Sequence, residues 1–155
     1  MAVNLTLSGY LASAVTITYA GGQAQAFNSL TDNEWTSLSD EFDNSTTKYA
    51  FADVYLDLGS AAFTGADSGI EIYLVPSVDG TNYPNWTENS TSDAQSNTIH
   101  FVGFVTTTGA TAAQKLVLAR VPLYNGKQKW AFRNRGNVTL NATNTLYYRP
   151  HSFAS

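Results

Sequence analysis

The chain contains no cysteine and few charged residues. Among its 155 residues, Asp, Glu, Lys and Arg together make up 13%. Without thiols the protein has neither disulfides nor cysteine nucleophiles, and most kinds of structural zinc site are excluded. A chain of this length buries enough surface to fold as one domain without such cross-links. The lack of cysteine favours assembly in a reducing compartment, so we expect a soluble protein made in the cytoplasm.

Export and membrane signals are also missing from the sequence. No basic segment precedes an apolar run at the N-terminus, and no apolar run reaches the roughly 18 residues that a spanning helix needs. The net charge of -4 argues against a protein that binds nucleic acid by electrostatic attraction. We therefore expect neither a nucleic acid nor a membrane as partner.

Groups that could carry chemistry are scarce. The two histidines, His100 and His151, have no acidic residue near them in the sequence, and no Gly-x-Ser-x-Gly motif is present. The acidic residues are too scattered to choose a glycosidase pair. The cluster of Asp40, Glu41 and Asp43 lacks the twelve-residue spacing and central glycine of a calcium loop, which favours a solvated or interface loop. We expect no enzyme, no cofactor and no metal site.

The residues that are plentiful favour β structure. Ile70, Ile72 and Leu74 alternate with other residues at a period of two, and Asp79-Gly80 supplies a turn after them. Asn125-Gly126 is the strongest hairpin signal in the chain. About eight such segments, separated by turns and without intervening helical patterns, predict an all-β protein. The simplest architecture is an antiparallel sandwich of the jelly-roll type, with helix only in short turns.

Residues 48–58 form a long strand candidate with two unlike faces. Alanine, valine and leucine at the even positions suit a tightly packed core. The odd positions combine aromatic rings with acids, namely Tyr49, Phe51, Asp53, Tyr55 and Asp57. Aromatic rings with scattered acids are typical of a surface that another protein or a sugar covers.

The first thirty residues contain no acidic, basic or histidine residue. Their apolar side chains are costly to leave in water, notably those of Leu5, Leu7, Val15 and Ile17. We therefore divide the chain into an uncharged arm, or strands that pack on the body or on a neighbour (1–30), and one sandwich domain (31–155). Our prediction for residues 1–27 is packing on a neighbouring chain or on a larger assembly.

The two signs of charge occupy different parts of the chain. Every acidic residue lies between Asp32 and Asp93, whereas seven of the eight basic residues lie between Lys115 and Arg149. Either the two groups interleave within one sheet, or oppositely charged surfaces of neighbouring copies meet. We expect the first arrangement for the strands and the second for the loop of Asp40, Glu41 and Asp43.

Several stretches resemble small virion structural proteins of tailed bacteriophages. They are IYLVPSVDGTNY (72–83), QKLVL (114–118), VPL (121–123), KWAFRN (129–134) and NTLYYRP (144–150). The resemblance extends over about residues 33–150 and transfers no catalytic residue. It implies a single β-sandwich that decorates or cements the capsid, with the major capsid protein and other copies of itself as partners, in a virion assembled from proteins made in the host cytoplasm. The symmetry of such a shell would favour a trimer at local threefold points.

Two other functions remain open at this stage. One is a carbohydrate-binding module, in which exposed Trp35, Tyr83 and Trp86 could stack on sugar rings. The other is a tail, fibre or baseplate component of a virion. Taken together, the candidate interface residues are Leu5, Leu7, Val15, Ile17, Trp35, Asp40, Glu41, Asp43, Tyr83 and Trp86.

Overall fold

The computed structural model describes residues 13–20, 26–64, 67–87, 98–109 and 111–152. Its strands are β1 (Val15–Thr16), β2 (Phe42–Asp43), β3 (Phe51–Leu58), β4 (Gly69–Pro76), β5 (Phe101–Thr106), β6 (Gln114–Pro122), β7 (Lys127–Arg135) and β8 (Thr145–His151). Among the described residues only Thr98 has a helical conformation. The prediction of an all-β protein is therefore confirmed.

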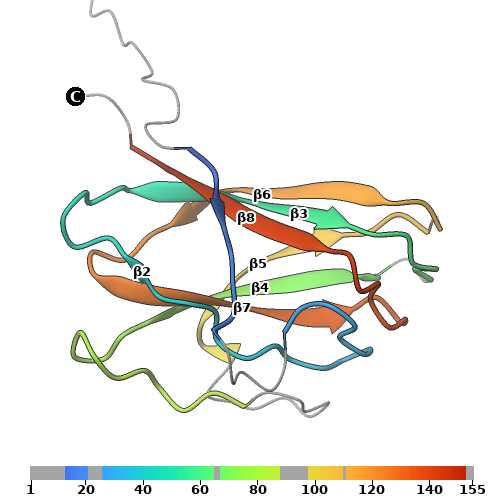
Figure 1. Cartoon of the computed structure of the whole chain (residues 1–155), viewed down its shortest axis with the longest axis horizontal. Helices are drawn as coiled ribbons and strands as arrows, with labels where there is room; N and C mark the ends of the chain where they lie inside the picture. The colour runs from blue at the N-terminus through green and yellow to red at the C-terminus, as the bar shows by residue number, and fades with distance from the viewer. Residues whose placement is uncertain (1–12, 21–25, 65–66, 88–97, 110, 153–155) are drawn as a thin grey trace, which may run out of the picture.

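The strands form two four-stranded antiparallel sheets that lie one above the other (Figure 1). Sheet A has the order β1-β8-β3-β6, and sheet B has the order β2-β7-β4-β5. The first strand thus pairs with the last, the second with the seventh, the third with the sixth and the fourth with the fifth. This nested pairing is that of a jelly roll, as the sequence predicts.

The core between the sheets comes from the strand positions with a period of two. Ile70, Ile72 and Leu74 of β4 are completely buried. They share one core cluster with Val54 and Leu56 of β3. The apolar faces predicted for β3 and β4 are therefore the faces that pack between the sheets. In β5 and β6 the register shifts, so Phe101 and Val117 are exposed although Val105 and Val121 are buried.

Two glycines allow close contacts along β5. A Cβ at Gly69 would lie 2.2 Å from the carbonyl oxygen of Val105 and 2.5 Å from the ring of Phe104. A Cβ at Gly103 would lie 2.5 Å from a methyl group of Leu118. Only a residue without a side chain fits at these positions, so β5 can pack against β4 and against β6 of the other sheet.

The two predicted turns are present. Gly126 has a positive φ of 146° in the connection from β6 to β7. After β4, the backbone N–H groups of Thr81 and Asn82 donate to Asp79 Oδ1, at 2.9 and 2.7 Å. These bonds, with that from Asn82 the largest cause, hold the pKa of Asp79 below its ordinary value.

The described part of the N-terminal region belongs to the domain itself. β1 pairs with β8, and the backbone N–H of Ile17 donates to the carbonyl oxygen of Leu146. Ile17 and Phe27 lie in the main core, whereas Val15 is 41% exposed. The prediction that this whole region packs on a neighbour is wrong for Ile17 and Phe27, because their own domain buries them. Leu5 and Leu7 lie outside the described residues.

Candidate interaction surfaces

The outward side of sheet A carries a row of stacked rings, which we call the ladder face. Tyr55 of β3 stacks on Tyr147 of β8, with ring centres 5.2 Å apart and planes 13° apart. Phe51 and His151 stack in the same way at the end of the two strands, with ring centres 5.9 Å apart. The register places Asp53 opposite Arg149 between the two stacks. The ladder face therefore consists of Phe51, Asp53, Tyr55, Asp57, Tyr147, Arg149 and His151.

Charges on the ladder face have partners within the chain. The side chain of Asp53 is 8% exposed, and its carboxylate accepts a hydrogen bond from the backbone N–H of Arg120 at 2.8 Å and lies 3.4 Å from Nε2 of His151. Asp57 forms an ion pair with Lys115 of β6. For these strands the prediction that acidic and basic residues meet within one sheet is confirmed.

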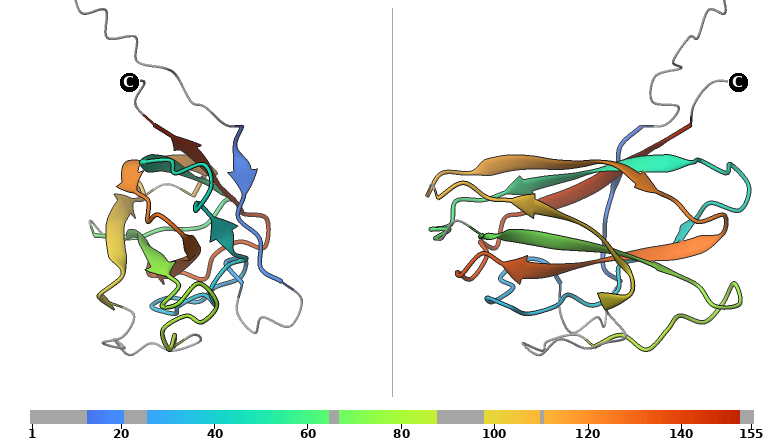
Figure 2. Two further views of the ribbon diagram at one scale, coloured as in Figure 1. Left: turned by 90° about the vertical axis from the view of Figure 1, so that its left-hand side faces the viewer. Right: turned by 180° about the vertical axis from the view of Figure 1, so that it is seen from behind.

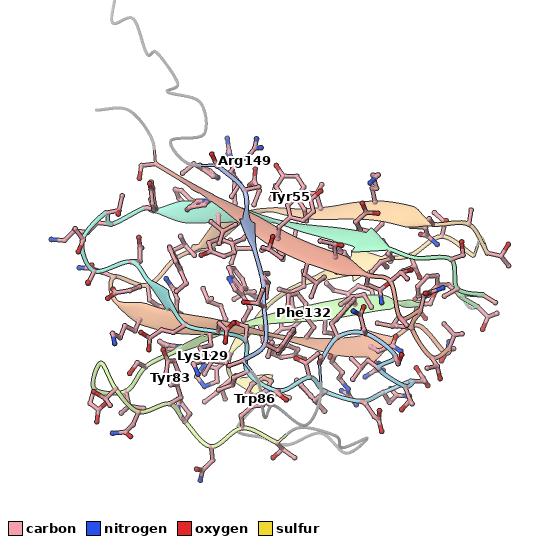
Figure 3. All side chains as sticks on the ribbon, in the orientation of Figure 1. Tyr55, Tyr83, Trp86, Lys129, Phe132 and Arg149 are labelled. Atoms are coloured by element: carbon pink, nitrogen blue, oxygen red, sulfur yellow. The ribbon has the colours of Figure 1, made fainter. Side chains whose placement is uncertain are left out.

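No described segment lies over the ladder face. Figures 1 and 2 show loops beneath sheet B but none above the outer side of β8, β3 and β6. Tyr55 and Arg149 point outward from this side (Figure 3). Their partly exposed side chains combine apolar rings with polar ends, which is the composition that protein interfaces favour.

The outward side of sheet B is covered by its own chain over β4 and β7, whereas Phe101 and Phe104 of β5 are exposed. Trp35 is completely buried against Tyr73, with ring centres 4.6 Å apart, and the edge of Trp86 packs on both. The indole N–H of Trp86 donates to the carbonyl oxygen of Thr36 at 2.7 Å. The expectation that Trp35 is exposed for stacking on a sugar is therefore wrong, because its segment pairs with β7 and its ring packs on Tyr73 of β4 and Arg133 of β7.

Arg133 is enclosed in this cluster. Its guanidinium lies 4.9 Å from the centre of the Trp35 ring, and its Nε donates to the carbonyl oxygen of Asn33 at 3.1 Å. Glu71 lies 3.7 Å from both Arg133 and Arg135 and accepts a hydrogen bond from the hydroxyl of Tyr73. A buried charge needs such partners. No pattern in the sequence indicates this buried network, because its residues come from distant segments of the chain.

Tyr83 lies beside the acidic loop. Its hydroxyl donates to Glu41 at 2.8 Å, and Nζ of Lys129 lies 4.7 Å from its ring centre (Figure 3). Glu41 also pairs with Lys127 at 2.9 Å, and the hydrogen bond from Lys127 lowers the pKa of Glu41. Tyr83 and Trp86 are both partly buried.

The other two acids of the loop also have partners in their own chain. The hydroxyl of Thr18 donates to Asp40, and the backbone N–H of Ser45 donates to Asp43 at 2.8 Å. That the loop forms a contact between copies stays a prediction, but such a contact would have to compete with these bonds.

Sites for small molecules are shallow. A hollow of about 130 Å³ lies between residues 15–18 and 39–42, above Trp130 and Tyr148. A second hollow, of about 330 Å³, lies between residues 76–80 and 124–127. Within the described ranges no three His, Cys, Asp or Glu side chains gather closely enough to hold a metal ion. No helix in the described part is long and apolar enough to cross a membrane.

Sequence reasoning found only half of the ladder face. The β3 half follows from alternation within residues 48–58, and the distribution of charge indicates that basic residues of late strands such as Arg149 meet it, but Tyr147 and His151 were not predicted to lie there. The final strand also alternates, with Leu146 and Tyr148 buried. The alternation therefore indicates that the odd positions of the final strand face outward. It does not indicate the register that brings Tyr147 beside Tyr55.

Comparison of the chain with protein-family models, with curated protein sequences and with solved structures found no match.

Proposed function

We propose that this protein is a non-enzymatic structural component of a bacteriophage virion, and specifically a decoration protein that binds the assembled head. The observation that carries the proposal is the ladder face, a row of partly exposed rings and paired charges that no described segment covers. Jelly rolls are common among capsid and lectin domains, so the architecture is compatible with this role.

The mechanism would be mechanical. Many copies bind the closed shell and bury surface across the junctions between capsid subunits. Because the decoration protein binds the assembled shell and not the separated capsid subunits, it stabilises the shell by mass action. The main partners would be the major capsid protein and other copies of this chain. Rings with few rotatable bonds suit such a contact because little side-chain entropy is lost on binding.

Copy number tests the proposal. Virions of the phage that encodes this chain are purified, and the chain is quantified by mass spectrometry against the major capsid protein. Hundreds of copies per virion support a place on the shell. A dozen or fewer copies would indicate a tail, fibre or baseplate component. The complete absence of the chain from purified virions would overturn the virion assignment.

A carbohydrate-binding module is the alternative from another class. With Trp35 buried, its support is reduced to the partly exposed Tyr83 and Trp86, and Tyr83 is already engaged by Glu41 and Lys129. The purified protein on a glycan array distinguishes the two functions. A decoration protein leaves the array unbound, whereas saturable glycan binding that is lost in Trp86→Ala would favour the module.

A further inference from the structure

The two sheets have four edge strands, and three of them are protected against pairing with another strand. β1 and β2 are only two residues long. β6 carries the exposed Lys115, a positive φ of 56° at Arg120 with an irregular register, and Pro122 at its end. Short length, charge, irregularity and proline are the devices by which natural sheets protect their edges.

The fourth edge, β5, has little of this protection. It is six residues long, and no Asp, Glu, Lys or Arg occurs from Thr98 to Gln114. One irregularity lies at Val102, and residues 103–106 continue in regular register with β4. The other side of β5 pairs with no strand of the described chain.

Apolar side chains are exposed along the same edge. Phe101 is 49% exposed and Phe104 is 37% exposed, and both occupy the outward side of sheet B opposite Tyr73 and Glu71. Ile99, just before the strand, is 73% exposed. An uncharged edge with exposed rings is a template for an added strand whose side chains are apolar on one face.

The N-terminal residues have this pattern. Val3, Leu5 and Leu7 alternate with Asn4 and Thr6, and the segment carries no charged side chain. Added beside β5, it would place its three apolar side chains next to Phe101 and Phe104, and no like charges would meet. We propose that the open edge of β5 binds residues 3–7 of a neighbouring copy as an additional strand of sheet B.

The topology indicates a neighbouring copy as the source of the added strand. The chain enters the fold at β1, whereas β5 lies at the opposite edge of the sandwich (Figure 2). Residues 8–14 reach at most about 25 Å when extended. That length suits two molecules side by side, with the β1 edge of one facing the β5 edge of the next. Such a head-to-tail contact closes into a ring or continues as a chain of molecules.

Disulfide trapping tests the contact, because the chain contains no cysteine of its own. Leu5→Cys and Thr106→Cys are made as separate proteins, mixed and oxidised. Thr106 is exposed on the outward side of β5, so we expect a disulfide between the two different chains. Thr6→Cys is the matched control, since its side chain would lie on the other face of the added strand and should give about tenfold less product.

Three results would overturn the proposal. The first is that neither Leu5→Cys nor Leu7→Cys forms a cross-link with Thr106→Cys. The second is a Thr106→Cys homodimer as the main product, which would mean that β5 pairs with β5 of another copy. The third is a disulfide formed only within single chains of the Leu5→Cys/Thr106→Cys double variant. The reactions use purified protein without particles. They can therefore succeed even if the decoration role fails, and the copy-number measurement judges that role separately.

A second measurement does not depend on cysteine chemistry. Deleting residues 1–12, or introducing charge by Thr106→Lys, should weaken self-association in sedimentation by about tenfold or more, equivalent to about 1.4 kcal/mol. Thr145→Lys, an exposed change on sheet A, is the control and should leave association unchanged. Equal self-association of the truncated and intact proteins would contradict the proposal.

Discussion

At the level of single residues, the contribution of each charged side chain to folding stability depends on how deeply it is buried. Asp53 and Asp57 occupy the same face of β3, four residues apart. The side chain of Asp53 is 8% exposed and accepts a backbone hydrogen bond, whereas that of Asp57 is 37% exposed beside a lysine that is 78% exposed. Exposed ion pairs contribute little because water screens them, but a buried acceptor leaves its donor unsatisfied when it is removed.

We therefore expect different costs for removing the two carboxylates. Asp53→Ala should lower the free energy of unfolding by about 1–3 kcal/mol, because the N–H of Arg120 loses its acceptor. Asp57→Ala should lower it by less than about 1 kcal/mol. Urea denaturation of both variants measures the difference, and equal losses would show that burial does not separate the two residues.

A tyrosine should govern part of the alkaline stability. Tyr148 is 5% exposed, and burial raises its pKa from 10.0 to about 12. Because the neutral phenol is favoured in the folded state, its contribution is complete below pH 10 and is lost as the pH rises to about 12. In Tyr148→Phe the decline in urea midpoint over this range should be shallower than in the parent protein. Burial also raises the pKa of Tyr19 and of Tyr83, so some decline should persist.

At the level of elements, sequence patterns predicted the strands of six or more residues, together with the buried faces of β3 and β4. They did not predict that Phe101 of β5 and Val117 of β6 are exposed, because the register shifts within both strands. The alternation of Val15 and Ile17 indicates a short strand where β1 lies, whereas β2 was not predicted, because two residues give no period. They also did not reveal that Trp35 closes over sheet B, where it makes a single bridge to Arg133. Alternation tells which side of a strand is apolar, but not which distant segment covers the other side. For the same reason the pairing of Tyr55 with Tyr147 could not be predicted, although the outward position of Tyr55 was.

The covering segment should be a major stabilising element. Trp35→Ala removes a completely buried ring that contacts Tyr73, Trp86 and Arg133, so we expect a loss of about 3–5 kcal/mol in the free energy of unfolding. Trp86→Ala, which removes a partly exposed ring from the same cluster, is the matched control and should cost clearly less. Chemical denaturation gives both values, and similar costs would mean that the cluster is not organised around Trp35.

At the level of the whole molecule, the two sheets differ in what lies outside them. Loops cover the outward side of sheet B and bury its second aromatic cluster, whereas the ladder face of sheet A is open. A molecule with one covered and one open face can lie on a large surface in a defined orientation. The acidic loop of Asp40, Glu41 and Asp43 lies at the β2 edge, and its carboxylates already have partners in the chain.

If the proposed decoration function holds, binding to phage heads that lack this protein should depend on the ladder face rather than on the loop. Tyr55→Ala/Tyr147→Ala should weaken binding by about thirtyfold or more, since a central interface ring is worth about 2 kcal/mol. The triple alanine variant at Asp40, Glu41 and Asp43 should bind as the parent does across a salt series near physiological ionic strength, because charges farther than about 8 Å from a contact are screened and contribute little to it. Unchanged melting temperatures would exclude unfolding as the cause. Weaker binding of the loop variant, with a smaller salt dependence, would instead place the loop in the contact. Unchanged binding of the double tyrosine variant would show that the ladder face is not part of the contact.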